Sequence, residues 1–305
     1  MDDDAPVWPR EAVYAAADWT EAERAIVPRA WWARASDGYR LGVLSWAGAS
    51  RPRGDLVILH GVQSHAGWYH GLGRRLAAAG LNAHFPDRRG SGANSPARGH
   101  AASARRLVDD VVEVLAAIPR TGGPLVLGGI SWGGKLAVVA AARNPRTVDG
   151  LALICPGLHP RVGVRAREKL GVAAALLTGQ AARPVFPIPL ADPALFTDNS
   201  AARRFIANDP LSLRLGTAGL LFASRMLDRQ VSRARRRVRC PALLMLAGRD
   251  RIVDNRSTRA YFEGLGSERK TVIEYPEAHH TLDFEPDPGR YVRDLVGWID
   301  AACVP

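Results

Sequence analysis

Short apolar runs alternate with helix-like stretches along most of this chain, and that alternation restricts its fold more than any other feature of the sequence. A continuous apolar run is typical of a strand buried on both faces of a parallel sheet. Alternating strand–helix units are typical of such a sheet covered by helices on both sides. The predicted strands lie at residues 55–60, 81–85, 124–128, 151–155, 242–247 and 271–275, and the predicted helices at 68–79, 103–117, 133–144, 255–265 and 288–302. The sequence therefore predicts an α/β fold with a mostly parallel central sheet.

Two segments depart from this alternation. Aromatic and β-branched runs on both sides of Asp37-Gly38 predict an antiparallel hairpin over residues 31–46. Residues 157–239 contain helical stretches around 166–179 and 217–229 but no obvious strand of the sheet. Since this insertion precedes the last two strands, we expect a helical cap over the carboxyl edge of the sheet, where open α/β sheets bind ligands.

These features divide the chain into three predicted parts. Residues 1–28 form an N-terminal arm with a short helix. Residues 29–156 and 240–305 form the α/β core, and residues 157–239 form the cap, or lid.

The composition is that of an ordinary globular protein, with 47% apolar and 23% charged residues, which excludes a disordered or collagen-like chain. No apolar run approaches the roughly 18 residues of a membrane-spanning helix, and the acidic start does not resemble a signal peptide. Cys155, Cys240 and Cys303 lack metal-ligand spacing and are interpreted as buried thiols. We therefore expect a cytoplasmic protein that needs no cofactor and no metal.

The net charge of +11 arises from 41 basic and 30 acidic residues. Only three of the basic residues are lysines, and the others are arginines. Because no recognition-fold signature accompanies the arginines, nucleic acid is not expected as a partner. Five arginines lie between residues 233 and 239. They could attract a phosphate-bearing substrate or an anionic membrane surface, or form a solvated edge of the cap. The oligomeric state is not indicated.

The segment Gly129-Ile130-Ser131-Trp132-Gly133 is a G-x-S-x-G motif between a predicted strand and a predicted helix. Such a motif turns so sharply that side chains at both glycines would collide with backbone, and it pushes the serine hydroxyl out of the sheet. It also places the Trp132 amide at a helix start, where unpaired N–H groups favour an anion. Ser131 is therefore a candidate nucleophile.

A serine hydroxyl is a poor nucleophile near neutral pH unless a base activates it and a third group orients that base. Asp250 directly follows the strand at 242–247, and His280 follows the strand at 271–275. Sites whose nucleophilic serine lies on a strand-to-helix turn have their residues in this chain order: serine, then acid, then histidine. We therefore predict a catalytic triad of Ser131, Asp250 and His280.

Two neighbouring residues offer alternatives. Asp254 lies close to Asp250, but it precedes a predicted helix and is interpreted as its N-cap. His279 is adjacent to His280, and only one of the two can face the serine. We favour His280.

The loop after the first core strand contains His60-Gly61-Val62-Gln63-Ser64-His65. Gly61 permits a tight turn that would direct the Val62 N–H at the substrate oxygen, beside the Trp132 N–H. These two amides are the predicted oxyanion-hole donors. His60 and His65 are interpreted as bracing the loop, because no carboxylate cluster of a metal site accompanies them.

Together, HGVQSHAGWY, PDRRGSG, GISWGG, GRDRIVD and EAHHTLDFE resemble the α/β-hydrolase superfamily. The resemblance covers residues 30–303 and is closest to the branch of monoacylglycerol lipases, lysophospholipases and serine aminopeptidases. It implies the α/β-hydrolase fold, the triad and oxyanion donors named above, and a structural D-x-R-G-x-G turn at Asp87. It further implies a serine hydrolase that cleaves a small acyl ester through an acyl-enzyme on Ser131.

Two other functions fit the same motifs. An acyltransferase or tailoring enzyme would use the triad to hand the acyl group to an alcohol or amine instead of water. A ligand-binding protein of the same fold would catalyse nothing, although it would have no need of all three triad groups. The apolar stretches of the cap, 172–177 and 220–227, could line an acyl pocket or pack against the sheet.

Overall fold

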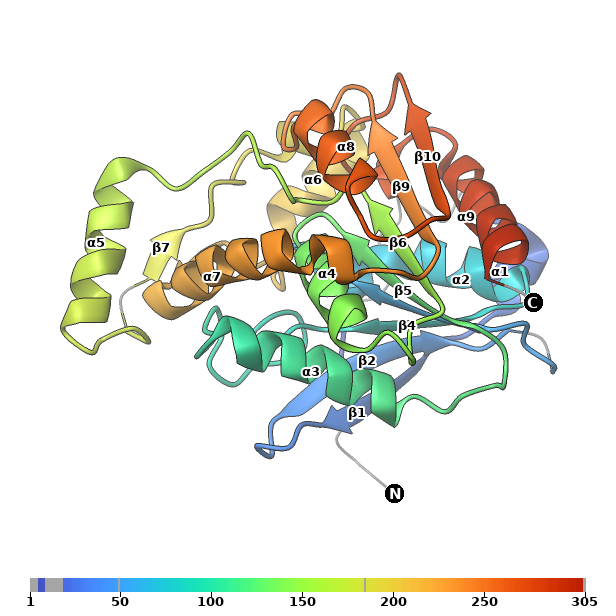
Figure 1. Ribbon diagram of the computed structural model, residues 1–305, viewed down its shortest axis with the longest axis horizontal. Helices are drawn as coiled ribbons and strands as arrows, with labels where there is room; N and C mark the ends of the chain where they lie inside the picture. Colours follow the sequence, from blue (N-terminus) through green and yellow to red (C-terminus); the bar gives the residue numbers. More distant parts are fainter. Residues whose placement is uncertain (1–4, 9–18, 49, 184, 304–305) are drawn as a thin grey trace.

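The computed structural model describes residues 5–8, 19–48, 50–183 and 185–303. Its centre is an eight-stranded sheet with the strand order β1-β2-β4-β3-β5-β6-β9-β10 (Figure 1). The strands are β1 (Arg29–Arg34), β2 (Arg40–Trp46), β3 (Asp55–Leu59), β4 (Asn82–Pro86), β5 (Leu125–Ile130), β6 (Gly150–Ile154), β9 (Ala242–Ala247) and β10 (Lys270–Tyr275).

The sheet is mostly parallel, as the sequence predicts. From β4 to β10 every neighbouring pair is parallel, whereas β1 pairs antiparallel with β2, and β2 antiparallel with β4. The hairpin predicted around Asp37-Gly38 is thus confirmed. Every residue of β3, β5, β6 and β9 is buried, which explains their continuous apolar runs.

Helices cover both faces of this sheet. Helices α2 (His70–Ala78) and α9 (Pro288–Ala302) pack together on one face, and α3 (Ala104–Ala117) and α4 (Gly133–Arg143) on the other (Figure 1). Helix α8 (Asn255–Glu263) packs on β9. The α/β-hydrolase fold is therefore confirmed. No helix in the described part of the chain has the length and apolarity to cross a membrane.

The helix predicted over 68–79 begins later than expected. Residues Ala66–Tyr69 form a 3-10 turn (η2), and α2 starts only at His70. The His65 ring caps this turn by accepting a hydrogen bond from the Gly67 N–H. A side-chain cap of this kind leaves no periodic signal in the sequence.

The insertion between β6 and β9 contains more helices and strands than the sequence predicts. Its predicted helices are α5 (Ala166–Leu177) and α7 (Ala218–Ala234), but it also holds helix α6 (Ser200–Asn208) and the 3-10 turn η3 (Pro193–Leu195). The strands β7 (Val185–Pro187) and β8 (Leu215–Thr217) form a separate antiparallel pair. These strands have three residues each, too few to show a pattern in the sequence.

Only part of the predicted N-terminal arm belongs to the described residues, because 1–4 and 9–18 lie outside them. A short helix, α1 (Glu21–Ala25), begins with a capping box between Thr20 and Glu23. The Trp8 indole is buried and donates a 2.7 Å hydrogen bond to Oδ2 of Asp87. The described part of this segment therefore packs on the core.

Candidate active site

Ser131 stands at the turn between β5 and α4 with a φ of 51°, in the left-handed region that side chains rarely adopt. Its N–H donates to the Ile154 carbonyl at 3.0 Å. Its carbonyl accepts from the N–H groups of Gly134 at 2.9 Å and Gly157 at 2.7 Å. Three backbone hydrogen bonds thus hold the strained residue in place.

The glycines of the motif are required by close backbone packing, as the sequence predicts. A Cβ at Gly129 would lie 2.6 Å from the Gly134 Cα. A Cβ at Gly133 would lie 2.1 Å from the Leu59 carbonyl oxygen. Neither contact is sterically possible without moving the backbone.

A Gly133→Ala substitution is therefore expected to destabilise the protein by about 1–3 kcal/mol or more, because β3 and the serine turn must separate. Thermal unfolding measures the loss. Gly297→Ala is the matched control, since nothing lies within 4 Å of a Cβ at this position of α9. In a helix interior, alanine is favoured over glycine by about 1 kcal/mol. Equal thermal midpoints of the two variants would contradict the inference that close backbone packing requires a glycine at position 133.

The structure brings the three predicted triad side chains together. His280 Nε2 lies 2.8 Å from Ser131 Oγ, and His280 Nδ1 lies 2.8 Å from Asp250 Oδ2. The side chains of His280 and Asp250 are only 2% and 1% exposed. Because an ionised carboxylate only accepts, Nδ1 carries the ring proton and Nε2 is left to accept from the serine hydroxyl.

Two backbone N–H groups hold the Asp250 carboxylate in place. Asp250 Oδ1 accepts from the N–H groups of Ile252 at 2.7 Å and Val253 at 2.9 Å. The other oxygen, Oδ2, is thereby directed at His280. One turn of chain after β9 therefore orients the imidazole.

The two alternatives to the triad residues lie elsewhere. Asp254 caps helix α8 by accepting from the Ser257 N–H at 2.7 Å. His279 lies 2.9 Å from Asp198 and 3.2 Å from Glu285, through Nε2 and Nδ1 respectively. Both nitrogens of that ring thus face carboxylates, whereas His280 faces the serine.

Val62 and Trp132, the predicted oxyanion donors, belong to turns that meet at Ser131. A Cβ on Gly61, the residue before Val62, would lie 3.3 Å from the Ser131 Cβ. Within the described part of the chain, neither the Val62 N–H nor the Trp132 N–H donates to an acceptor. Both backbone N–H groups, from turns that meet at Ser131, are therefore free to donate to a ligand.

His60 and His65 both brace the loop between β3 and α2. His60 Nε2 accepts from the Arg88 N–H at 2.9 Å, so Nδ1 carries the proton and donates to the Gly61 carbonyl at 2.7 Å. Burial lowers the pKa of His60 well below its usual value. Among the described residues, no group of three or more histidine, cysteine or acidic side chains is arranged to hold a metal ion.

Asp209, in the insertion, is a partner of this loop that the sequence did not reveal. Its carboxylate accepts from the Trp68 indole at 2.6 Å and lies 3.0 Å from His65 Nε2. Burial raises its pKa, but the hydrogen bonds with His65 and Trp68 outweigh burial and hold the pKa at about 2. A buried charge therefore links the insertion to the loop that carries Val62.

Aromatic rings from the insertion (Phe196 and Phe205) and from the rest of the chain (Trp68 and Phe284) gather beside the triad. The Trp68 ring centroid lies 5.9 Å from that of Phe196, 5.7 Å from Phe205 and 5.6 Å from Phe284. The Phe196 ring in turn lies 6.1 Å from the His280 ring. The sequence alone does not reveal the three phenylalanines as neighbours of the site, because their contacts with Trp68 join distant parts of the chain.

A histidine between a buried carboxylate and a serine at a strand-to-helix turn, on a mostly parallel sheet, defines the class of serine hydrolases with the α/β-hydrolase fold. Comparison with known proteins gives the family. The family model described as serine aminopeptidase, S33, matches residues 50–287. The chain belongs to this family, which confirms the resemblance seen in its motifs, and it is a serine hydrolase of the type that acts on ester bonds.

Two curated lipases match over most of their length. The chain is 27% identical over 265 residues to a monoacylglycerol lipase of Mycolicibacterium smegmatis, covering 86% of this chain and 93% of that protein. It is 26% identical over 257 residues to the human monoglyceride lipase, covering 82% of each chain.

Solved structures show the same fold. A monoglyceride lipase of Saccharomyces cerevisiae, solved with a substrate analogue, aligns with a TM-score of 0.80 at 20% identity, covering 95% of this chain and 99% of that one. The monoacylglycerol lipase of Paleococcus ferrophilus aligns with a TM-score of 0.74 at 24% identity, covering 86% and 99%.

Proposed function

We propose that the protein hydrolyses carboxylic esters through an acyl-enzyme on Ser131, with His280 as general base and acid and Asp250 orienting the imidazole. The observation that carries this proposal is the pair of 2.8 Å contacts that His280 makes with Ser131 and Asp250. The same contacts provide both the activation and the orientation that a serine nucleophile needs.

The geometry supports a two-step reaction. Ser131 Oγ attacks the ester carbonyl while its proton passes to His280 Nε2, and the resulting imidazolium gives that proton to the departing alcohol. Water then loses a proton to Nε2 and attacks the acyl-enzyme, and the acid leaves as Ser131 regains its proton. Each step passes through an oxyanion, which the N–H groups of Val62 and Trp132 would stabilise; losing one such donor typically costs about 10²–10³ in rate.

We also propose that residues 157–239 act as a cap on a core formed by 29–156 and 240–305. Contacts from the insertion to the site support this division. The Ser224 hydroxyl accepts from the Trp132 indole at 2.8 Å, and the Leu213 N–H donates to the Gln63 carbonyl at 2.9 Å. Phe196 lies against His280.

For the substrate, we propose monoacylglycerols or similar single-chain esters. The relatives named monoacylglycerol lipase support this choice, and so does the aromatic cluster of Trp68 and three phenylalanines beside the histidine. Apolar walls favour an acyl chain through the burial of about 0.8 kcal/mol per methylene.

The test is a panel of monoacylglycerols and p-nitrophenyl esters of graded acyl length, each run with the wild type and Ser131→Ala. We expect turnover by the wild type only, with kcat/KM that rises with chain length until the apolar surface is filled. Turnover that persists undiminished in Ser131→Ala would contradict the proposal, as would no turnover of any ester.

A further inference from the structure

Arg88 is a buried arginine directly beneath the loop that carries Val62. It is 8% exposed and occupies the open second position of the D-x-R-G-x-G turn after β4. Its guanidinium donates from Nη1 to the Gly61 carbonyl at 3.2 Å and from Nη2 to the Val62 carbonyl at 2.9 Å. The two donors therefore hold two consecutive peptide units of the loop.

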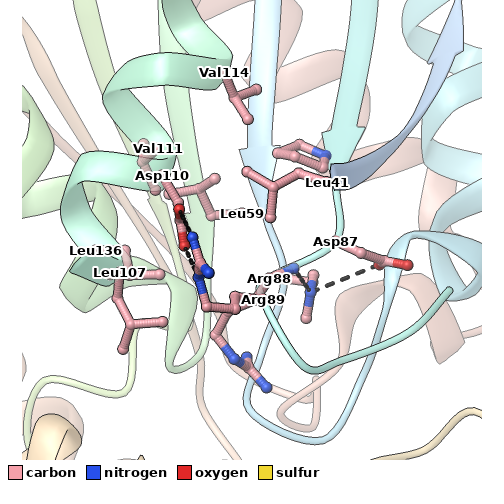
Figure 2. Close-up of a pocket in the computed structure, with 12 residues that line it drawn as sticks. Leu41, Leu59, Asp87, Arg88, Arg89, Leu107, Asp110, Val111, Val114 and Leu136 are labelled. Carbon is pink, nitrogen blue, oxygen red and sulfur yellow. Dashed lines mark hydrogen bonds and ion pairs between the residues drawn. The ribbon is translucent and has the colours of Figure 1, made fainter. Parts of the chain in front are cut away.

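The neighbouring arginine, Arg89, contacts a different set of residues. Arg89 pairs with Asp110 of α3 at 2.7 Å and with Asp37 at 2.9 Å, and Figure 2 shows the Arg89–Asp110 contact beside a small cavity. Among the described residues, Arg88 makes no ion pair within 4.0 Å with any carboxylate. The Arg88 guanidinium thus donates its hydrogen bonds to backbone carbonyls. An ion pair does not explain its buried position.

Those carbonyls determine where an amide points. The Gly61–Val62 peptide bond is trans, so the Val62 N–H points opposite to the Gly61 carbonyl. Arg88 and His60 both donate to that carbonyl. Holding the carbonyl in this direction therefore points the Val62 N–H the opposite way within the peptide plane, away from Arg88 and His60.

The same guanidinium also contacts the second predicted donor residue. Arg88 Cζ lies 4.9 Å from the centroid of the Trp132 ring, a cation–π contact. The indole N–H of that ring donates to the Ser224 hydroxyl at 2.8 Å. One buried cation therefore contacts both residues whose amides are the proposed oxyanion donors.

We propose that Arg88 is a positioning residue of the oxyanion hole, which sets the Val62 amide through the Gly61 carbonyl and ties that loop to Trp132. The inference rests on the proposed function and deepens it. Burial lowers the pKa of Arg88 to about 10, so the guanidinium stays protonated at neutral pH and keeps all its donors. A planar fork suits two neighbouring carbonyls, whereas an ammonium is a compact point charge whose three donors are not arranged in a fixed fork.

The test compares Arg88→Met, Arg88→Lys and the matched control Arg89→Met. Each variant is measured for its thermal midpoint, its number of fluorophosphonate-titratable sites, and kcat and KM on one p-nitrophenyl ester. It is also measured for inhibition by a trifluoromethyl ketone, whose serine adduct carries an oxyanion in the hole.

We expect Arg88→Met to lower kcat per titrated site about 10–100-fold with KM within about twofold, and to weaken ketone binding by the same factor. For Arg88→Lys, kcat per titrated site and the affinity for the ketone should lie between those of Arg88→Met and those of the wild type. Arg89→Met should lower the thermal midpoint and leave kcat per titrated site unchanged, because Arg89 contacts Asp110 of α3, Asp37 and the Tyr39 ring instead of the loop that carries Val62.

The proposal is overturned if the Arg88 variants lose only stability, with kcat per site and ketone affinity equal to those of the wild type. If Arg88→Met does not fold, Arg88→Lys decides by the same two readouts. Failure of the proposed function itself would look different, because the wild type would then turn over no ester or Ser131→Ala would remain active.

Discussion

Replacing Ser131 by alanine is expected to lower kcat for a carboxylic ester by about 10⁶-fold, since no other group can form the acyl-enzyme. The residual rate would come from binding and the oxyanion donors alone. The substitution removes one oxygen that lies 2.8 Å from His280. The backbone hydrogen bonds that hold the turn do not involve that oxygen, so the thermal midpoint should stay close to that of the wild type.

Single-turnover and steady-state kinetics on a p-nitrophenyl ester measure this effect. Ser257→Ala is the control, because Ser257 is exposed and lies in the first turn of α8. It should leave kcat unchanged. A Ser131→Ala protein that keeps more than about 1% of wild-type kcat would show that another nucleophile does the chemistry.

Asp250→Asn is expected to lower kcat by about 10⁴-fold while changing KM little, as loss of the orienting acid does in serine hydrolases. Asparagine has the same shape, and its Oδ1 can still accept from the N–H groups of Ile252 and Val253. Its amide nitrogen, however, would donate toward His280 Nδ1. That contact stabilises the tautomer with the proton on Nε2, which cannot accept the serine proton.

The control for this prediction is the same substitution four residues further on. Asp254 caps α8, and asparagine is as good an N-cap as aspartate. Asp254→Asn should therefore keep kcat within about twofold of the wild type. If the two variants lost activity equally, Asp250 would have no special part in orienting the imidazole.

Much of the site could be predicted because its backbone requirements are local. The serine turn needs glycines within four positions of one another, and a short stretch of sequence records that requirement. Asp250 and His280 each directly follow a strand, so the chain order alone suggests that they meet. The strands themselves were recognisable because burial on both faces leaves only apolar residues.

The partners of the site could not be predicted, because they depend on contacts between distant segments. Asp209 meets His65 across 144 positions of the chain, and Trp132 meets Ser224 across 92. Arg88 lies at the position that the turn motif leaves open, so no local pattern assigns it a role. Helix α6 and the three-residue strands β7 and β8 are too short for their periodicity to be recognised.

The most direct test of the account is to react the protein with a fluorophosphonate and locate the adduct by peptide mass spectrometry. We predict one adduct per chain, on residue 131, and its disappearance in His280→Ala, where no base can take the hydroxyl proton. An adduct on any other serine, or labelling as fast in His280→Ala as in the wild type, would contradict the central claim that residue 280 activates residue 131.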